Sequence, residues 1–310
     1  MKDSDYAVVI GGANIDIHGI PAETLKMGDS NPGVVNLSAG GVGRNIAENT
    51  ARLGVDVKLL TAVGKDPHGN QILTETASAG VDTGRVLRLT DQATSTYLAI
   101  LDESGDLNIA ISHMEIMDRV DIAYIKANAS LIADAALLIV DTNIPIRSIE
   151  YLSANFADRP IFADSVSASK ALGLKTALAA CHTIKPNKFE AEVLTGTKIS
   201  KPDDAPKAAA KLLAKGVQRV FLSLGEKGLY FCSRDAEELI QIPETKIINA
   251  TGAGDAFMAG LAYCFLNRIS GGEAARFALG ASAIAIGHAN TINPHISVAN
   301  INVMARKIKC

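Results

Sequence analysis

Tryptophan is absent from this chain of 310 residues, and aromatic residues make up only 5% of it. So few rings argue against a platform on which the bases of single-stranded nucleic acids stack. The 30 basic and 33 acidic side chains nearly balance, for a formal charge of -3 at pH 7. A chain without excess positive charge has no electrostatic footprint for phosphate backbones. The composition therefore predicts no nucleic-acid partner.

Cysteine is also sparse, and its spacing fits neither a zinc site nor a Cys-x-x-Cys pair. The six histidines are scattered too, so the sequence gives no support for a metal cluster or a Ser-His-Asp arrangement. A reducing, cytoplasmic location fits this cysteine usage best. The four cysteines are Cys181, Cys232, Cys264 and Cys310.

Long apolar runs are missing as well. No stretch reaches the roughly 18 consecutive apolar residues that a membrane span needs. Residues 1–6 lack the apolar core of a signal peptide. We therefore expect no membrane segment and no secretion signal. At 48% hydrophobic, the chain can nevertheless bury a large core, as one large α/β domain or two smaller ones.

Short apolar runs alternate with helical patterns along most of the chain. Such near-continuous apolar strands between helices predict an α/β fold with a mostly parallel sheet covered on both faces. We expect strands at 7–10, 55–63, 136–140, 161–163, 183–184 and 220–224, and helices at 46–53, 149–156, 171–180 and 205–214. Ligands of such sheets bind beyond the carboxyl ends of the strands. The polar residues found there are Asn14, Asp16, Asp141, Asn143, Asp164, Asn187 and Ser223.

Two segments depart from this pattern. Residues 94–101 and 107–111 flank a turn that contains glycine, which is typical of a β-hairpin. Residues 15–38 are also strand-like, with proline and glycine interrupting any helical pattern. We expect a small β-sheet lid, formed from about 15–38 and 94–112, that projects from the core. An edge extension of the main sheet is the alternative.

A glycine-rich segment at 249–257, Asn-Ala-Thr-Gly-Ala-Gly-Asp-Ala-Phe, leads into a helical pattern. Free backbone N–H groups at a helix start bind anions, and Asp255 in the first turn could take a proton from an attacking hydroxyl. This combination indicates phosphoryl transfer. The alternative is a glycine-eased turn in which Asp255 is an ordinary acidic residue of a helix start. The expected apolar face of the helix comprises Met258, Leu261, Ala262, Phe265 and Leu266.

A second glycine-rich segment, Gly-Gly-Val-Gly-Arg-Asn at 40–45, precedes the helix expected at 46–53. Its glycines would let a ligand approach the backbone, and Asn45 can both donate to and accept from hydroxyls. The spacing is not that of the dinucleotide fingerprint, and no Walker-type phosphate loop occurs in the chain. A tight loop with a capping Asn is the alternative.

Two further segments could serve a nucleotide. Asn187 and Glu190 share one face of a starting helix, where Glu190 could orient water around a magnesium ion; a capping box is the alternative. Residues 223–228, Ser-Leu-Gly-Glu-Lys-Gly, follow a strand and could wrap a triphosphate with backbone N–H groups. A plain hairpin turn between 219–224 and 229–232 is the alternative.

Taken together, these motifs resemble those of the PfkB (ribokinase-like) family, in family order and over essentially the whole chain. The resemblance rests on Asn14-x-Asp16, on segments 40–45 and 223–225, on Asn187-x-x-Glu190, and on 251–257. It implies a single domain over 1–310, with a three-layer α/β/α core, a mostly parallel sheet and a β-sheet lid. It also implies ATP and Mg2+, and we expect a homodimer that pairs through the lid.

The resemblance assigns a role to each matching residue. Asp255 would be the base that accepts the proton of the substrate hydroxyl. The anion hole would comprise Gly252, Ala253 and Gly254. The sugar hydroxyls would be bound by Asn14, Asp16, Gly41 and Asn45. Asn187 and Glu190 would serve the phosphates and the hydrated metal. Ser223, Gly225, Gly228 and Thr251 would lie along the nucleotide.

Asn249 departs from the family pattern, where an Asp often helps to bind a monovalent cation. Its neutral amide makes activation by potassium doubtful. Within the family, segments 29–33, 164–170 and 249–255 are most similar to members that phosphorylate the 5′-hydroxyl of pseudouridine. Ribose, a ketose or another nucleoside are the alternative acceptors, and a non-catalytic sugar- or nucleotide-binding regulator is the alternative of another class. Further contacts with the acceptor are expected from Thr94, Tyr97, Asp164 and Lys170, and a solvated lysine at a helix start is the alternative for Lys170.

Overall fold

A central sheet of eight strands organises the computed structural model, which describes residues 6–242 and 245–308. The pairings from β4 through β12 are parallel, and β13 and β14 add antiparallel strands at one edge. The prediction of a mostly parallel sheet is therefore confirmed. In spatial order the strands are β14 (Glu237–Ile240), β13 (Leu229–Ser233), β12 (Arg219–Ser223), β11 (Cys181–Ile184), β10 (Ile161–Asp164), β9 (Leu137–Asp141), β1 (Tyr6–Ile10) and β4 (Asp56–Leu60).

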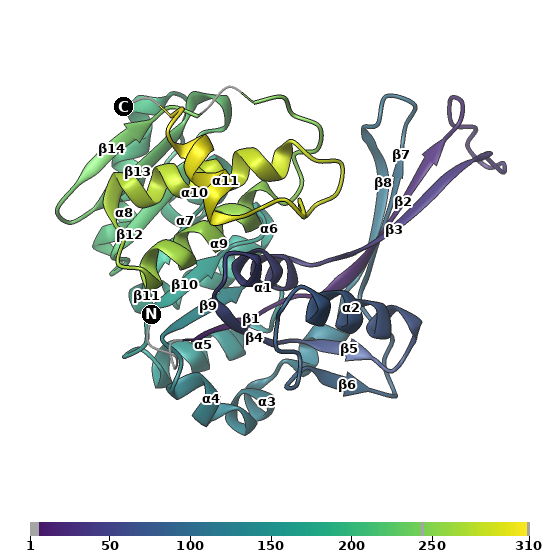
Figure 1. The fold of residues 1–310 in the computed structure, drawn as a ribbon, viewed down its shortest axis with the longest axis horizontal. Coiled ribbons are helices and arrows are strands. Elements are labelled where there is room, and N and C mark those ends of the chain that lie inside the picture. Colours follow the sequence, from purple (N-terminus) through teal and green to yellow (C-terminus); the bar gives the residue numbers. More distant parts are fainter. Residues whose placement is uncertain (1–5, 243–244, 309–310) are drawn as a thin grey trace.

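Helices cover both faces of this sheet, giving three layers (Figure 1). Strand β1 shows the division, because Ala7 and Val9 pack into one apolar cluster and Val8 and Ile10 into the other. The first cluster includes α1 (Val42–Arg52), α9 (Ala253–Leu266), α10 (Gly271–Ile286) and α11 (Val298–Ala305). The second includes α3 (Ile122–Ala127), α4 (Ala129–Ala133), α5 (Ile146–Asn155), α6 (Ala168–Ala171), α7 (Lys188–Thr195) and α8 (Ala205–Ala214).

A separate four-stranded sheet extends away from the core, as Figure 1 shows at the upper right. This confirms the predicted lid, and the alternative of an edge extension is wrong. Its base is anchored where Ile15 and Ala39 pack against Val63 and Ile72. Its strands, in spatial order, are β3 (Gly33–Gly40), β2 (Asn14–Pro21), β7 (Thr96–Leu101) and β8 (Leu107–His113). Beside it lie α2 (Pro67–Ser78) and the pair β5 (Ala62–Gly64) and β6 (Leu87–Leu89).

Two local predictions are wrong. The strand expected at 55–63 divides at Thr61, because β5 leaves the main sheet to pair with β6. The helix expected at 171–180 is absent: α6 ends at Ala171 and two short 3-10 turns follow, Leu172–Leu174 and Leu178–Ala180. Gly173 is a poor helix former. A side chain there would come within 3.2 Å of Ile146 on α5.

Helix α9 is also not amphipathic as predicted. Every residue from Asp255 to Ala262 is buried, whereas Phe265 and Leu266 from the expected apolar face are only partly buried. The helix lies between α1 and α10 and against the sheet. Gly260 permits this packing, because a side chain there would lie 2.9 Å from the backbone of Ala278. A helix that is apolar on all sides belongs to a core.

Some predictions concern features that the sequence lacks. Within the described residues, no helix is long and apolar enough to cross a membrane. Cys181, Cys232 and Cys264 are free and buried. Cys310 and the start of the chain at 1–5 lie outside the described residues.

Candidate active site

The start of helix α9 forms the centre of the site. Gly252 takes a left-handed φ of 83°, and a side chain there would collide with the carbonyl of Thr291, so glycine is required. Ala253 and Gly254 then open the helix, and Asp255 follows as its third residue, 8% exposed. The first N–H groups of a helix have no partner within it. The predicted glycine-rich helix start with a carboxylate in its first turn is therefore present, and its binding of an anion stays a prediction.

Asp255 lies in surroundings that favour its protonated form. Burial and, to a smaller degree, the nearby negative charge of Asp164 raise the pKa of Asp255 to about 7. A hydrogen bond of 2.8 Å from the Asn45 side-chain amide and the charge of Lys185 act in the opposite direction. A carboxyl group with this pKa is well matched to accept a proton near neutral pH.

Lys185 is the functional candidate that the sequence reasoning missed. Its Nζ lies 3.1 Å from Asp164 Oδ2, and a side chain at Gly254 would come within 2.9 Å of it. Burial alone would lower the pKa of Lys185, but the charges of Asp164, Glu190 and Asp255 outweigh this and raise it. The ammonium group therefore stays charged beside the helix start. Lys185 directly follows β11, and ligands of parallel sheets bind beyond the carboxyl ends of the strands, so its position in the sequence already marks it as a candidate.

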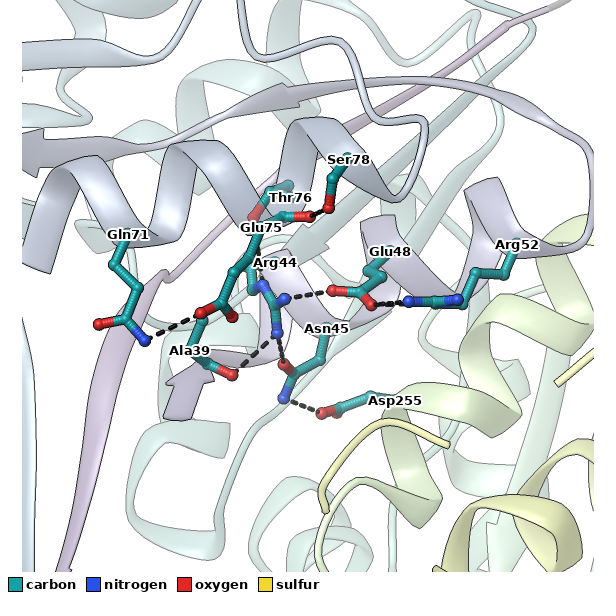
Figure 2. A network of polar contacts seen from close by, with 10 residues as sticks. All are labelled: Ala39, Arg44, Asn45, Glu48, Arg52, Gln71, Glu75, Thr76, Ser78 and Asp255. Carbon is teal, nitrogen blue, oxygen red and sulfur yellow. Dashed lines mark hydrogen bonds and ion pairs between the residues drawn. The ribbon is translucent and has the colours of Figure 1, made fainter. Parts of the chain in front are cut away.

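The second glycine-rich segment starts helix α1, which begins at Val42, four residues earlier than predicted. Gly41 is its N-cap with a φ of 96°, and Arg44 N donates to the carbonyl of Gly12 at 3.0 Å. Asn45 therefore lies inside the helix, and the alternative of a capping Asn is wrong. Its amide Nδ2 instead donates to Asp255 Oδ2, so the two glycine-rich segments meet at this bond (Figure 2).

Three of the residues that are predicted to bind the phosphoryl-acceptor substrate lie together at the base of the lid. Asn14 Nδ2 donates to Asp16 Oδ1 at 2.7 Å. Tyr97 on β7 is the register partner of Asp16 on β2. Burial raises the pKa of Asp16 despite the bond from Asn14. The lid thus carries a polar group where its strands join the core.

Lys170 lies on α6 and reaches Asn143, which follows the end of β9. Its Nζ donates to Asn143 Oδ1 at 2.5 Å, so it is not a simply solvated lysine. Asp141 accepts from the backbone N–H groups of Asn143 at 2.7 Å and Gly12 at 2.9 Å. Burial raises the pKa of Asp141 to about 6. This polar chain therefore joins the end of β9 to the loop after β1.

Thr94, in contrast, is engaged elsewhere. It is buried, its hydroxyl donates to Asp66 Oδ1 at 2.7 Å, and the same hydroxyl accepts from Gly64 N at 2.9 Å. Its backbone N–H also binds Asp66. The structure thus gives Thr94 a local structural contact, and the predicted contact with an acceptor stays a prediction.

Asn187 and Glu190 form the capping box that was the alternative reading of this pair. Asn187 Oδ1 accepts from Glu190 N at 3.0 Å, and Glu190 accepts from Asn187 N at 2.9 Å. Glu190 also accepts from the Ser165 hydroxyl at 2.8 Å and is 4% exposed. Its carboxylate is therefore held in place, and any role toward a metal would pass through water.

The segment 223–228 links β12 to β13 as a hairpin and also forms the wall of a pocket. The hairpin is thus confirmed, and the contact of this segment with a triphosphate stays a prediction. Gly225 and Gly228 have positive φ values of 64° and 106°. The polar and backbone lining of the pocket comes from four parts of the chain: Lys185, Ser223, Gly225, Gly228, Ala253, Gly254 and Ser282.

Thr251 and Asn249 form the turn that precedes α9. Asn249 Oδ1 accepts from Thr251 N at 2.9 Å, and Asn249 Nδ2 donates to the carbonyl of Ala289 at 2.9 Å. Both ends of the amide are therefore used within the turn. Among the residues that the structure describes, no three His, Cys, Asp or Glu side chains gather to hold a metal ion.

Known proteins share both the sequence pattern and the fold. The model of the pfkB family carbohydrate kinases matches residues 4–297. Pseudouridine kinase of Escherichia coli is 40% identical over 311 residues, covering 100% of this chain and 99% of that protein. A carbohydrate kinase structure from Agrobacterium tumefaciens has a TM-score of 0.86 at 27% identity, covering 98% of each chain.

A more distant structure has the same fold. Arabidopsis thaliana ribokinase, solved with ribose and ATP, has a TM-score of 0.86 at 21% identity and covers 98% of this chain and 99% of its own. The core and lid described above are thus those of ribokinase-like kinases. The chain belongs to the pfkB family of carbohydrate kinases, and it is a phosphotransferase that acts on a hydroxyl group.

Proposed function

We propose that this chain, as one ribokinase-like domain over 1–310, transfers a phosphoryl group from ATP to the 5′-hydroxyl of pseudouridine. The observation that supports the chemistry is the buried Asp255 at an open helix start, with a pKa raised to about 7 and Lys185 beside it. The full-length similarity to E. coli pseudouridine kinase supports the choice of acceptor.

Asp255 acts as the general base in this proposal. It accepts the proton of the acceptor hydroxyl while the hydroxyl oxygen forms a bond to the γ-phosphorus. The bond from that phosphorus to its bridging oxygen breaks, and ADP leaves. Catalysis of this kind depends on position and charge neutralisation more than on covalent chemistry. Asn45 holds the carboxylate through its 2.8 Å bond.

The pocket between 223–228 and the start of α9 would bind the triphosphate. The first N–H groups of α9, from Gly252 to Gly254, and the ammonium of Lys185 would neutralise the transferred phosphoryl group. Mg2+ would neutralise charge on the phosphates, and Glu190 would hold it through water, because this ion keeps most of its hydration shell. That habit suits the buried Glu190, whose carboxylate is already held by Asn187 and Ser165.

The acceptor would lie under the lid, between its polar base and Asp255. Asn14, Asp16 and Gly41 would bind ribose hydroxyls, with Tyr97 beside Asp16. Asp164 ends β10 and Lys170 lies on the following helix α6, and both would contact the base or the phosphoryl group. The predicted location is cytoplasmic, and the three free buried cysteines fit a reducing compartment.

A panel of acceptors tests this proposal. Purified protein with ATP and Mg2+ is assayed against pseudouridine, uridine, adenosine, ribose and fructose. We expect the highest kcat/KM with pseudouridine. A higher kcat/KM with ribose or fructose would make the chain a sugar kinase of the same family. Binding of these ligands without turnover of any would favour the non-catalytic regulator.

We further propose a homodimer that pairs through the lid. The strand register places Leu37, Ile17, Leu98 and Ile111 in one row across a single face of the lid. Leu37 and Ile111 are 49% and 62% exposed. A second row, of Val35, Gly19, Ile100 and Ile109, lies beside the first on the same face. An exposed apolar face of this kind is typical of a protein contact, and a second copy presents the same face.

Two neighbouring substitutions test this dimer. Val35→Lys places a charge on the apolar face, whereas Asn36→Lys places the same charge on the opposite face of β3. Sedimentation is expected to show a monomer for the first variant and a dimer for the second and for the wild type. A monomeric wild type would contradict the proposal.

A further inference from the structure

Arg44 is a buried cation with no part in the chemistry described so far. It is 4% exposed and its guanidinium contacts three elements at once (Figure 2). Nη1 donates to the carbonyl of Ala39 on lid strand β3 at 2.8 Å, and Nε donates to the hydroxyl of Thr76 on α2 at 3.2 Å. Nη2 forms an ion pair with Glu48 on α1. Such a fork of donors fixes the guanidinium plane.

The same guanidinium also determines which way the Asn45 amide faces. Arg44 Nη1 donates to Asn45 Oδ1 at 3.2 Å. A guanidinium can only donate, so the atom of Asn45 that faces it must be the oxygen. The amide nitrogen is then left to face Asp255, where it donates at 2.8 Å. An ionised carboxylate can only accept, so both ends of the amide are matched.

Glu48 lies between two arginines, and this gives the chain an internal comparison. Arg44 and Arg52 both pair with Glu48, each four residues away along α1. The side chain of Arg52 is 28% exposed, and its hydrogen bonds run to Glu48. Only Arg44 also contacts Asn45. The two arginines therefore share the ion pair but not the contact toward the base.

We propose that Arg44 is a positioning residue: it fixes the Asn45 amide so that its nitrogen faces Asp255, and thereby keeps the base oriented and ionised. The inference rests on the proposed function of Asp255 as the base. Because Arg44 also holds the carbonyl of Ala39, the same side chain ties the end of lid strand β3 to the site. The guanidinium of Arg44 thus contacts the lid directly and the proposed base, Asp255, through Asn45.

The test replaces each arginine by lysine. A lysine can keep the ion pair with Glu48, but its single ammonium group cannot reach Ala39, Thr76 and Asn45 together. Loss of the bond from Asn45 would favour protonated Asp255, since a hydrogen bond to the charged form stabilises it. In Arg44→Lys the acidic limb of the pH profile of kcat/KM is expected to move up by about one pH unit. At pH 6 the kcat/KM of this variant should then be about tenfold below that of the wild type, and the difference should become small by pH 8.5. Arg52→Lys is expected to keep the wild-type profile.

A second readout does not depend on turnover. The 13C carboxyl resonance of Asp255, identified by its absence in Asp255→Asn, is titrated by NMR in the wild type and both lysine variants. We expect its midpoint to rise in Arg44→Lys only. An unchanged midpoint there, or an equal rise in Arg52→Lys, would overturn the proposal. A shift in Arg44→Lys from a protein that phosphorylates no acceptor would instead contradict the proposed function and leave the positioning role standing.

A double variant guards against failure to fold. Arg44→Met with Glu48→Met removes both buried charges together, which is often neutral for stability when the new side chains fill the space. It is expected to move the Asp255 midpoint upward as Arg44→Lys does. A folded double variant with the wild-type midpoint would also overturn the proposal.

Discussion

The starts of helices α1 and α9 are built alike but differ in what surrounds them. Each follows a glycine with positive φ, 96° at Gly41 and 83° at Gly252, and neither has a side-chain cap. The start of α1 is closed, because Arg44 N donates to Gly12 and its side chain is buried against Glu48. The start of α9 opens into a pocket.

This difference shows that a glycine-rich helix start does not by itself make an anion site. At α1 the backbone N–H of Arg44 and the buried charges of Arg44 and Glu48 have partners within the protein, so the segment holds Asn45 in place. At α9 the first residues, Ala253 and Gly254, line a pocket that also contains the charged Lys185. The role of each segment is therefore decided by what packs against it. The Asn45–Asp255 bond joins the fixed segment to the open one.

The largest effect is expected from Asp255, the proposed base at the start of α9. Asp255→Asn keeps the shape and can still accept a bond from Asn45, but it cannot take a proton. We expect kcat to fall by about 10²-fold or more, the usual scale for a general base, with KM for the acceptor nearly unchanged. Steady-state kinetics measure both. Near-normal turnover would mean that α9, like α1, only holds its neighbours.

Lys185 is expected to have the next largest effect. Lys185→Met removes the charge near Gly254 and leaves Asp164 without its partner at 3.1 Å. We expect kcat/KM for ATP to fall by about 10–100-fold, the scale of a lost charge contact in the transition state. Lys211→Met, on the exposed side of α8, is the control and should behave as the wild type. Equal activity of the two variants would argue against a phosphate site at the start of α9.

The pH profile tests the same region in the unmodified protein. The pKa of Asp255 is raised to about 7, and the base must be ionised to act. Activity should therefore be present above pH 7 and fall by about tenfold per pH unit below it, because only the ionised fraction reacts. The measurement is kcat/KM between pH 5.5 and 9 with acceptor and ATP. A profile that stays flat down to pH 5.5 would exclude Asp255 as the titrating group.

The order of strands and helices could be predicted because apolar periodicity reports which faces are buried. Helix α8 spans the predicted 205–214, and the lid was visible in its hairpin and interrupted strands. The course after Ala171 could not be predicted, because Gly173 responds to the close approach of Ile146 from a distant helix. The all-round burial of α9 also depends on its neighbours α1 and α10, which periodicity along one helix does not reveal.

The candidate site could also be predicted only where its residues are neighbours in the sequence. Asp255 and the glycines before it are local in sequence, so their geometry follows from the motif. Lys185 belongs to no glycine motif, and its charge matters only because β11 ends beside α9. The contact of Arg44 with Asn45 is local, but its function depends on Asp255, which lies 210 residues further along the chain.

The smallest effect concerns the turn before α9. The amide of Asn249 donates to the carbonyl of Ala289, which a cation would otherwise be free to bind. We expect potassium to change the rate of the wild type very little. Asn249→Asp restores a carboxylate that accepts but cannot donate, so it should repel this carbonyl and favour a cation between them. The variant is expected to gain a few-fold activation by potassium over sodium, about one kcal/mol, the scale of a partly exposed charge pair. Rates measured in potassium chloride and in sodium chloride at the same concentration test this activation. Strong potassium dependence of the wild type would show that the turn before α9 is open to cations.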